Sequence, residues 1–520
     1  RELNHWLRVS LLLLICLERF SILWSLCSYL SFSLPRCDSR SSNSSLALSS
    51  SHSDKSQFGF LRSIDSQRRD TDSGSVLMSI FGPLLSSSEL VPISCCQLDR
   101  LSIICSVRKP LHGVGLMNEK VVPRTMAPYR LALLPGDGTG REVMEEVKRI
   151  LSTFHDSGAI SLETTEIPCG GQHYLDTGEE WPTGSFEHCR DESDAIVVGA
   201  VGWPGATLPN GDIAGGQALL GLRSALDLYA NVRPVKLYKG VKHKVHGTFI
   251  DVWDNELVDV VMVRENTEGL YHALLRRSGM AARGEERDEP LVIDGFPGLE
   301  GEVGWDVRPI SRKGSERVIR FSFELAKRRE SRFGSVQKVT CVDKSNVTRG
   351  CRLFRDVFRE VSSEYHGIVT NEAFIDAFTM WLVRSPEDLD VVVLPNMFGD
   401  IATDLASVLQ GGMGMAASAN IGDEHMLFEP VHGSSPKYAG QNKVNPIAAI
   451  SSVQLMFDSL GLKNDDQEAI LCAEVIERAI SEHMSSGGPV TYDLGGKAST
   501  TEVGEAITSR CAAILTELGS

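Results

Sequence analysis

From residue 129 onward, short apolar runs alternate with longer stretches in which apolar residues recur every three or four positions. The continuous apolar runs predict buried strands at residues 130–134, 195–198, 258–263, 338–342 and 391–394. Helical spacing predicts helices at residues 142–151, 316–328, 372–382 and 402–410, and a loop is predicted at 135–140. Because strands and helices alternate, we predict an α/β fold with a largely parallel core sheet.

Residues 1–117 differ from this pattern, since they are rich in Ser and Leu and show no sustained periodicity. The apolar run at 9–17 is interrupted by Glu18 and Arg19, and a membrane span needs about 20 apolar residues, so no membrane segment is predicted. We interpret residues 1–117 either as a targeting segment or as translated upstream sequence that precedes a start at Met117 or Met126. The expected location is the cytoplasm, or an organelle matrix if this segment is a transit peptide. Residues 281–304 are interpreted as a polar, mobile insertion without an assigned function.

Charge and cysteine content narrow the function classes. The chain of 520 residues carries a formal net charge of −16, and the acidic excess lies after residue 127. An acidic body argues against nucleic-acid binding, although a few local arginines can still hold a small anionic substrate. The twelve cysteines include no CxxC pair, and those of the body are expected to be reduced thiols.

Three arginines and a glycine loop are candidates for anion binding. Gly136, Gly138 and Gly140 follow a predicted strand, but their spacing is not GxGxxG, so a tight turn between strand and helix is the better explanation. Arginine suits carboxylates because its fork donates two parallel hydrogen bonds, and Arg223, Arg233 and Arg264 are the candidates. Arg264 follows a predicted buried strand directly and therefore needs a partner.

Carboxylates, a lysine and a tyrosine form a second set of candidates. Asp400 and Asp404 stand four residues apart at a predicted helix start, which favours one helical face. Such acids suit Mg²⁺ or Mn²⁺, with Asp376 as a third ligand, although the helix dipole alone also favours acids at a helix start. Lys344 follows a predicted strand and could act as a base, and Tyr271 could donate a proton.

Together these segments resemble the isocitrate/isopropylmalate dehydrogenase family of β-decarboxylating dehydrogenases over residues 129–518. The resemblance rests on residues 135–140, 222–234, 263–271, 342–347, 395–404 and 429–434. It implies a two-domain α/β fold with a cofactor site that is not of the GxGxxG type. One domain combines residues 128–228 with 411–520, and the other, residues 229–410, supplies a dimer interface.

The resemblance also implies residue roles. Arg223, Arg233 and Arg264 clamp the malate-type carboxylates, and Asp376, Asp400 and Asp404 are metal ligands. Lys344 removes the C2 hydroxyl proton through water, and Tyr271 protonates the former β-carbon after CO2 leaves. Lys344 and Asp376 belong to the neighbouring subunit's site, so a homodimer with shared active sites is expected.

The substrate expectation depends on Leu219 and Leu220, which precede Arg223. A leucine-lined pocket cannot compensate for the desolvation of a third carboxylate, so isocitrate and homoisocitrate are alternatives to 3-isopropylmalate, D-malate or tartrate. The segment from Arg264 to Gly269 is RENTEG rather than the RELTGG of 3-isopropylmalate enzymes, and those enzymes also carry an acidic residue near Gly216, which is the second departure. Both departures leave the choice of substrate open.

For the cofactor, the resemblance implies NADP, with NAD as the alternative. Lys437, Tyr438 and Tyr492 match NADP-using relatives, but Gly496 stands where those relatives have an arginine. A cation favours a 2′-phosphate, which an acid would repel. The other expected cofactor-binding residues are His432, Gly433, Ser434 and Asn445.

Two other function classes remain open at this stage. A non-catalytic regulatory subunit of a hetero-oligomeric dehydrogenase would usually lack a base, an acid or a metal ligand, and this chain retains all of them. A Mg²⁺-dependent phosphatase could use clustered aspartates, but it would not explain the arginines. Nicotinamide reduction without phosphate release distinguishes the dehydrogenase from the phosphatase.

Overall fold

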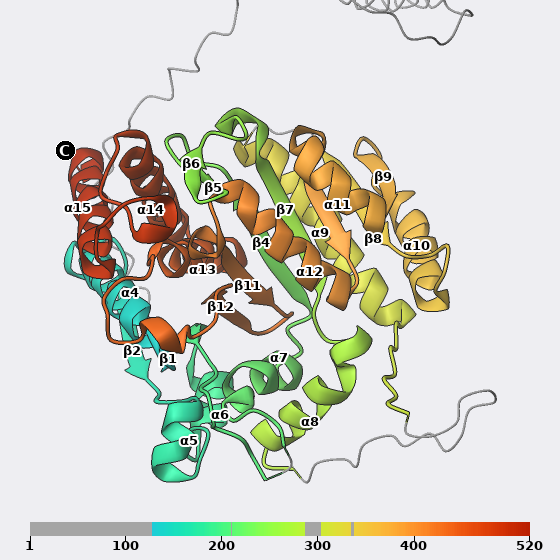
Figure 1. Cartoon of the computed structure of the whole chain (residues 1–520), viewed down its shortest axis with the longest axis horizontal. Coiled ribbons are helices and arrows are strands. Elements are labelled where there is room, and N and C mark those ends of the chain that lie inside the picture. The colour runs from blue at the N-terminus through green and yellow to red at the C-terminus, as the bar shows by residue number, and fades with distance from the viewer. Residues whose placement is uncertain (1–126, 210, 286–302, 334–336, 520) are drawn as a thin grey trace, which may run out of the picture. The chain divides into compact units, whose positions relative to one another are not determined.

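A ten-stranded sheet runs through the unit formed by Val121–Ser520 (Figure 1). The computed structural model describes residues 127–209, 211–285, 303–333 and 337–519. The strand order is β2-β1-β3-β12-β11-β4-β7-β10-β8-β9. The strands are β1 (Tyr129–Gly136), β2 (Leu162–Glu166), β3 (Ala195–Ala200), β4 (Ala230–Lys236), β7 (Asp259–Glu265), β8 (Lys338–Asp343), β9 (Val369–Phe374), β10 (Val391–Leu394), β11 (Ala417–Ile421) and β12 (Met426–Pro430).

Pairing is parallel on both flanks of the sheet and antiparallel at its centre. The antiparallel pairs are β12–β11, β11–β4 and β4–β7, and the other six pairs are parallel. The predicted α/β fold with a largely parallel core sheet is therefore confirmed. The β11–β4 pair joins strands from residues 128–228 and 411–520 to strands from residues 229–410. The boundary between the two predicted domains falls between β11 and β4 in the sheet, and the division into two domains stays a prediction.

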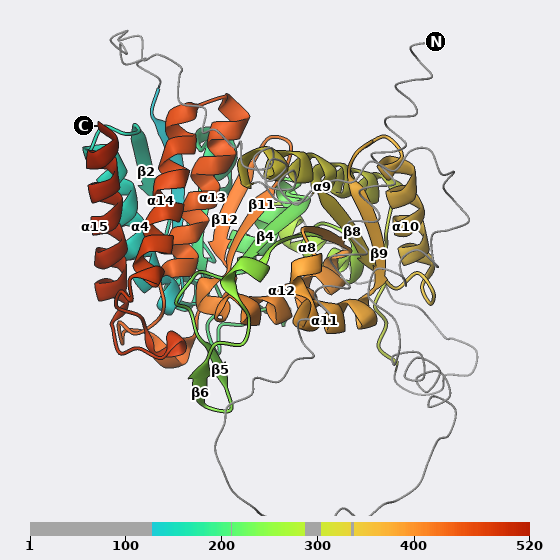
Figure 2. The same ribbon diagram turned by 90° about the horizontal axis from the view of Figure 1, so that it is seen from above.

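Helices cover both faces of the sheet (Figure 2). They are α4 (Thr139–Asp156), α5 (Gly171–Thr177), α6 (Ser185–Glu187), α7 (Leu222–Ala225), α8 (His272–Ala282), α9 (Arg312–Phe333), α10 (Arg349–Ser362), α11 (Ile375–Arg384), α12 (Asn396–Ser407), α13 (Ile447–Asn464), α14 (Gln467–Ser485) and α15 (Thr500–Gly519). α9 and α12 both pack on β7 and β10, and Figure 2 shows them on opposite sides of the sheet. A small hairpin, β5 (His243–Val245) and β6 (Thr248–Ile250), lies outside the main sheet.

Side-chain alternation along the strands builds a core on each face. On β1, Leu131 and Leu133 belong to the larger hydrophobic cluster, whereas Ala132 and Leu134 belong to the smaller one. This period of two is what a strand that is buried on both faces requires. The body's cysteines are free and buried in the core, as predicted: Cys169, Cys189, Cys341, Cys351, Cys472 and Cys511.

The five predicted strands are present, but three local predictions were wrong. The predicted helix at 372–382 begins only at Ile375, because Glu372 and its neighbours pair with β8 as part of β9. Arg264 lies inside β7 rather than after it, because pairing of Asn231 with Arg264 extends the strand to Glu265. The loop predicted at 135–140 shrinks to two residues, since β1 ends at Gly136 and α4 begins at Thr139.

Some sequence-based expectations lie outside the described residues. They concern the targeting or upstream segment at 1–117 and the larger part of the insertion at 281–304, namely residues 286–302. Among the residues that the structure does describe, no helix is both long and apolar enough to cross a membrane.

Candidate active site

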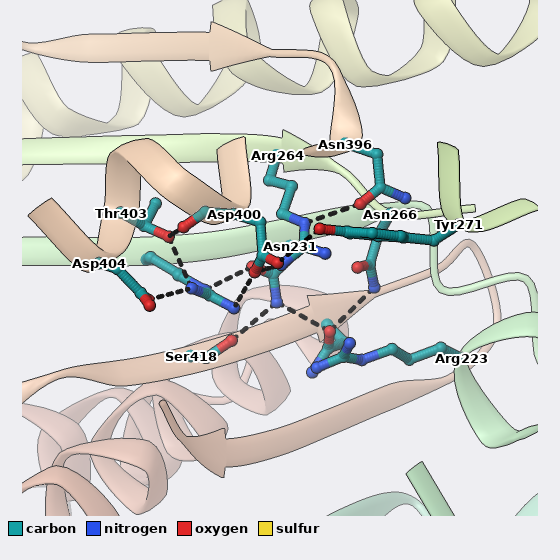
Figure 3. A network of polar contacts seen from close by, with 12 residues as sticks. Arg223, Asn231, Arg264, Asn266, Tyr271, Asn396, Asp400, Thr403, Asp404 and Ser418 are labelled. Atoms are coloured by element: carbon teal, nitrogen blue, oxygen red, sulfur yellow. Dashed lines mark hydrogen bonds and ion pairs between the residues drawn. The ribbon is translucent and has the colours of Figure 1, made fainter. Parts of the chain in front are cut away.

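Two of the three candidate arginines, Arg233 and Arg264, contact the carboxylates of α12, and Arg223 lies close to them (Figure 3). Arg233 lies on β4, Arg264 on the adjacent strand β7, and Arg223 on α7. α12 starts one residue after β10, which pairs with β7, so its first turns lie beside Arg264. A Cβ atom at Gly399 would lie 2.6 Å from the Cβ of Arg264, so the helix approaches this closely only because residue 399 is glycine.

Asp400 is the centre of the cluster. One carboxylate oxygen accepts a hydrogen bond from Arg264 Nη1 and lies 3.7 Å from Arg233 Nη2, while the other accepts a hydrogen bond of 3.2 Å from the Tyr271 hydroxyl. Asp404, one turn further along α12, lies 3.7 Å from Arg233 Nη1. The predicted placement of both aspartates on one helical face is observed in the structure.

Buried amide side chains next to the arginines link β4 to β11 and β11 to β12. Asn231 Nδ2 donates to Ser418 Oγ at 2.7 Å and to Asn420 Oδ1 at 2.8 Å, and Asn266 Nδ2 donates to the same Asn420 oxygen at 2.9 Å. Asn420 Nδ2 in turn donates to Glu429 at 2.8 Å. All five side chains are buried, and sequence reasoning assigned a role to none of them. The available signal was polar residues inside short apolar strands.

The arginines are themselves buried, and their orientation is fixed by neutral groups. Arg233 donates through Nε to Asn231 and through Nη1 to Thr403, and Arg264 Nε donates to Asn396 at 2.9 Å. Burial lowers the pKa of Arg264 to about 9, with further lowering from Arg233, while Asp400 opposes the shift. Burial likewise lowers the pKa of Arg233. These cations are destabilised by desolvation and would gain from an additional anion.

Arg223, on α7, contacts β12 rather than the aspartates of α12. Its Nη2 pairs with Glu429 at 2.5 Å, and both side chains are buried. Its Nε is buried and finds no hydrogen-bond partner among the residues that the structure describes. A carboxylate ligand would satisfy this donor.

Lys344 and Asp376 form a separate pair. Lys344 Nζ lies 2.8 Å from Asp376 Oδ1, and the lysine's hydrogen bond lowers the pKa of Asp376. Within residues 127–519, apart from the undescribed gaps, no group of three His, Cys, Asp or Glu residues is placed to hold a metal ion. One chain therefore assembles Asp400 with Asp404 but does not add Asp376 to them.

Ser434, one of the predicted cofactor residues, contacts the N-terminus of α4. The main-chain oxygen of Ser434 accepts hydrogen bonds from the Thr139 amide at 2.9 Å and from its hydroxyl at 3.0 Å. A Cβ at Gly138, where φ is +53°, would lie 2.4 Å from the same oxygen, so the predicted tight turn allows this contact. His432 Nδ1 lies 3.1 Å from the Gly433 oxygen, and its buried Nε2 has no partner in the described part of the chain.

Two tyrosines and two lysines lie together beyond this turn. The rings of Tyr438 and Tyr492 are 5.4 Å apart, and Lys437 Nζ lies 5.4 Å from the Tyr438 ring. Lys443, which sequence reasoning missed, lies 5.2 Å from the Tyr492 ring. Asn445 Nδ2 donates to Asp493 at 3.1 Å.

Leu219 and Leu220 line a pocket of about 410 Å³. They belong to the helical turn Gln217–Gly221 that leads directly into Arg223, and Leu274 of α8 lines the same pocket. Gly216 also lines it, and a Cβ there would lie 4.0 Å from the Glu180 carboxylate. Glu180 thus brings an acidic side chain beside Gly216 from elsewhere in the chain, which the sequence neighbourhood of Gly216 did not reveal.

The sequence matches the family described as isocitrate/isopropylmalate dehydrogenase over residues 130–507. The chain belongs to this family. It is 38% identical over 385 residues to 3-isopropylmalate/3-methylmalate dehydrogenase of Methanocaldococcus jannaschii, covering 74% of this chain and 98% of the relative. It is 35% identical over 391 residues to the probable tartrate dehydrogenase/decarboxylase of Bacillus subtilis, covering 74% of this chain and 99% of the relative.

Solved structures agree with this assignment. Isocitrate dehydrogenase from Methylococcus capsulatus superposes with a TM-score of 0.60 at 32% identity, covering 74% of this chain and 99% of that chain. A β-decarboxylating dehydrogenase from Thermococcus kodakarensis gives 0.56 at 34% identity, covering 75% and 97%. The protein is therefore a decarboxylating oxidoreductase of the isocitrate/isopropylmalate dehydrogenase family, which generally uses NAD(P) and a divalent metal.

A buried ion pair supports the lysine loop of this dehydrogenase. Asp343, which directly precedes Lys344, receives two hydrogen bonds from Arg355, at 2.8 and 2.9 Å, and a third from the Ser345 amide. Asp343 is fully buried. The pair thus fixes the backbone from which Lys344 extends.

Replacement of Arg355 by Leu is expected to destabilise the protein by about 3–5 kcal/mol, because it leaves the Asp343 charge buried and unpaired. Urea unfolding followed by circular dichroism would measure the loss. Arg359→Leu is the matched control, since Arg359 pairs with Glu372 at the surface, where solvent screens the pair, and its replacement should cost much less. Equal losses for the two variants would contradict the structural role of the Arg355–Asp343 pair.

Proposed function

We propose that this protein catalyses the metal-dependent oxidative decarboxylation of a malate-type 2-hydroxy acid, with 3-isopropylmalate, D-malate and tartrate as candidate substrates and NADP as the preferred cofactor. The observation that carries the proposal is the pair of buried arginines, Arg233 and Arg264, around Asp400, together with the buried Arg223, which follows a helical turn whose leucines line a pocket. Neither feature alone selects this chemistry, whereas together they match a substrate with two carboxylates and an apolar or absent substituent.

The arginines bind the substrate carboxylates. Arg233 and Arg264 are held by Asn231, Thr403 and Asn396, so they keep their orientation when Asp400 changes partner. The unpartnered Nε of Arg223 adds a third donor. Because the arginines are preorganised in this way, less conformational entropy is lost when the substrate binds.

The acidic residues fit a divalent cation. Asp400 and Asp404 offer carboxylate oxygens, the ligands that Mg²⁺ and Mn²⁺ prefer, and the Asp404 side chain is half-exposed. Burial raises the pKa of Asp404, which means that its ionised form is destabilised. A cation bound beside the carboxylate would stabilise that ionised form. Asp376 of the partner subunit completes the proposed ligand set. A metal ion held there supplies Lewis-acid stabilisation of negative charge on the substrate's C2 oxygen.

Two side chains move the protons. Lys344 of the partner subunit would take the C2 hydroxyl proton through water, and a bound NAD(P) would supply the hydride acceptor for the oxidation at C2. When the bond to the β-carboxylate breaks and CO2 leaves, the electron pair remains on the β-carbon, and the Tyr271 hydroxyl delivers a proton there. Burial and the neighbouring Asp400 raise the pKa of Tyr271, which keeps its proton in place until it is needed.

Exposed apolar side chains support the homodimer. Among the described residues, α11 and α12, together with the turn that follows α12, expose large hydrophobic side chains at Met380, Trp381, Val383, Ile401 and Val408. Several exposed large apolar side chains on two helices in contact are typical of a subunit interface. Because Asp376 lies on α11 and Asp400 on α12, a dimer formed through these helices would bring the two sets of residues toward each other.

The NADP preference rests on the lysine and tyrosine cluster around Tyr438. Lys437→Ala should lower kcat/KM for NADP about tenfold and leave that for NAD unchanged. Only NADP carries a 2′-phosphate, and the variant removes the cation that would bind it. Steady-state kinetics with both cofactors would measure the ratio. Lys239→Ala removes an exposed lysine elsewhere and is the control. An equal fall with both cofactors would assign Lys437 a role unrelated to cofactor choice.

Nicotinamide reduction by the full chain with Mn²⁺ tests the proposed function. 3-Isopropylmalate, D-malate, tartrate and isocitrate would each be supplied with NAD and with NADP, and CO2 release would be measured in parallel. Turnover of a malate-type acid with equimolar CO2 supports the proposal, and a preference within that panel identifies the substrate. Turnover of isocitrate alone would contradict the proposed substrate class.

A further inference from the structure

Polar side chains form a row across four neighbouring strands at the centre of the sheet. On β11, Ser418 and Asn420 are two residues apart and therefore point to the same face. Glu429 of β12 lies opposite Ser418 in the strand register. Asn231 of β4 lies opposite Asn420 on one side and opposite Arg264 of β7 on the other. Residues opposite each other share a face, so the whole row lies on the face that α12 covers, where Arg264 pairs with a carboxylate of that helix.

Asn420 connects two of the buried arginines through this row. Its Oδ1 accepts a hydrogen bond of 2.8 Å from Asn231, whose own Oδ1 accepts one of 2.8 Å from Arg233 Nε. Its Nδ2 donates to Glu429 at 2.8 Å, and the same glutamate oxygen pairs with Arg223. One continuous chain of polar contacts therefore leads from Arg223 through Asn420 to Arg233.

The two connected arginines come from different parts of the chain. Arg223 lies on α7, before the predicted domain boundary at residue 229, and Arg233 lies on β4, after it. Both arginines and the three side chains that connect them are buried. Hydrogen bonds in such a weakly polar environment are strong and have few alternative partners, so they hold the side chains in one arrangement. The spacing between the two guanidinium groups thus depends on the row as a whole.

The neighbours of Asn420 do not need it to satisfy their own hydrogen bonds. Asn231 Nδ2 also donates to Ser418 Oγ at 2.7 Å. Asn266, which donates to Asn420 as well, has a second acceptor in a main-chain oxygen at 3.1 Å. Glu429 would keep its ion pair with an arginine. Because loss of Asn420 leaves none of these groups without a partner, the fold should tolerate substitution at this position.

We infer that Asn420 is a positioning residue that sets the spacing of Arg223 and Arg233, so that both arginines can bind one substrate molecule at the same time. Asn420 contacts neither arginine directly and acts through Asn231 and Glu429. The inference rests on the proposed function in one respect, namely that both arginines bind carboxylates of the substrate.

Asn420→Ala in the full chain tests the inference. The variant should raise KM about tenfold and change kcat less than about twofold, because misplaced arginines weaken binding of the ground state and of the transition state alike. A purely structural defect would instead reduce the amount of folded enzyme, which lowers the apparent kcat and leaves KM unchanged. Steady-state kinetics would be measured with whichever of 3-isopropylmalate, D-malate, tartrate and isocitrate the wild type turns over fastest, and circular dichroism would check the fold.

Ser418→Ala is the matched control. It removes a buried hydrogen bond to the same Asn231 amide from the same face of β11, but it leaves the chain of contacts from Arg223 to Arg233 intact. Its KM should stay within about twofold of the wild-type value. Equal increases of KM in the two variants would mean that any lost polar group beside Asn231 disturbs the site, and the role assigned to Asn420 would be wrong.

Asn420→Ser decides the matter if the alanine variant does not fold. It keeps a polar group, but one hydroxyl replaces the separate oxygen and nitrogen of the amide and cannot reproduce both contacts, so KM should still rise about threefold. An unchanged KM in a folded variant at position 420 would overturn the inference.

Arg223→Lys and Arg233→Lys separate a failure of this inference from a failure of the proposed function. Both variants keep the positive charge but lose the fork that binds a carboxylate through two hydrogen bonds, so each should raise KM at least about tenfold. If both raise KM and the variants at Asn420 do not, only the inference is wrong. If neither raises KM, the proposed binding of the substrate by these arginines is itself wrong.

Discussion

Asp400→Asn should lower kcat by about three orders of magnitude or more and weaken Mn²⁺ binding, because the variant loses the carboxylate at the centre of the cluster. Asp400 is the residue on which Arg233, Arg264 and Tyr271 converge. Asparagine has nearly the same size but offers a neutral oxygen, so a divalent cation loses its strongest electrostatic partner. Titration calorimetry with Mn²⁺ and steady-state kinetics would measure the two effects.

The same substitution should leave the fold intact. Arg264 keeps its hydrogen bond to Asn396, and Arg233 keeps those to Asn231 and Thr403, so neither buried guanidinium loses all of its partners. Circular dichroism would check this. Asp356→Asn removes an exposed acid on α10 and is the control for the general effect of one lost charge. Unchanged Mn²⁺ affinity in Asp400→Asn would remove Asp400 from the metal site.

Hydrophobic patterning predicted the strands that contain a continuous apolar run and missed buried strands in which polar residues interrupt that run, such as β11 and β12. β7 and β10 read as apolar runs because every residue of the first but Asp259, and every residue of the second, is buried. β4 was missed because Asn231 and Arg233 alternate with apolar residues and Pro234 follows them, a pattern that favours a loop. Its antiparallel pairing with β7 on one side and β11 on the other supplies the strand's stability instead.

Site residues could be predicted from the sequence only where their residue type is unusual in its sequence context. Buried arginines and paired aspartates are unusual enough to be noticed in a sequence, and the structure brings Arg233, Arg264, Asp400 and Asp404 together. The amides that orient them could not be predicted, because asparagine is common in loops and only the fold shows that Asn231 is buried between two strands. Glu180 was missed for a related reason, since its proximity to Gly216 arises from tertiary structure alone.

The separation of Lys344 from the cluster leads to the second large effect. In one chain, Lys344 pairs with Asp376, and none of its ion pairs or ring contacts within the described residues involves Asp400 or Asp404. If Lys344 serves the site of the partner subunit, Lys344→Ala and Asp400→Asn inactivate different parts of the same shared site. Each homodimer should then be inactive, because both of its sites lack one essential group.

Hybrid dimers of these two inactive variants should recover activity. In a hybrid, one site combines the intact Asp400 of one chain with the intact Lys344 of the other, while the second site carries both substitutions. Unfolding and refolding an equal mixture places half of the chains in hybrids, so about a quarter of the wild-type activity should return.

A kinetic assay before and after mixing measures the recovered activity. A mixture of Asp400→Asn with Asp404→Asn is the control, because those two residues lie in the same chain's half of the site and cannot complement each other. Recovery confined to the first mixture would require a dimer with shared sites. No recovery from a correctly refolded mixture would mean that Lys344 acts within its own chain or outside the site.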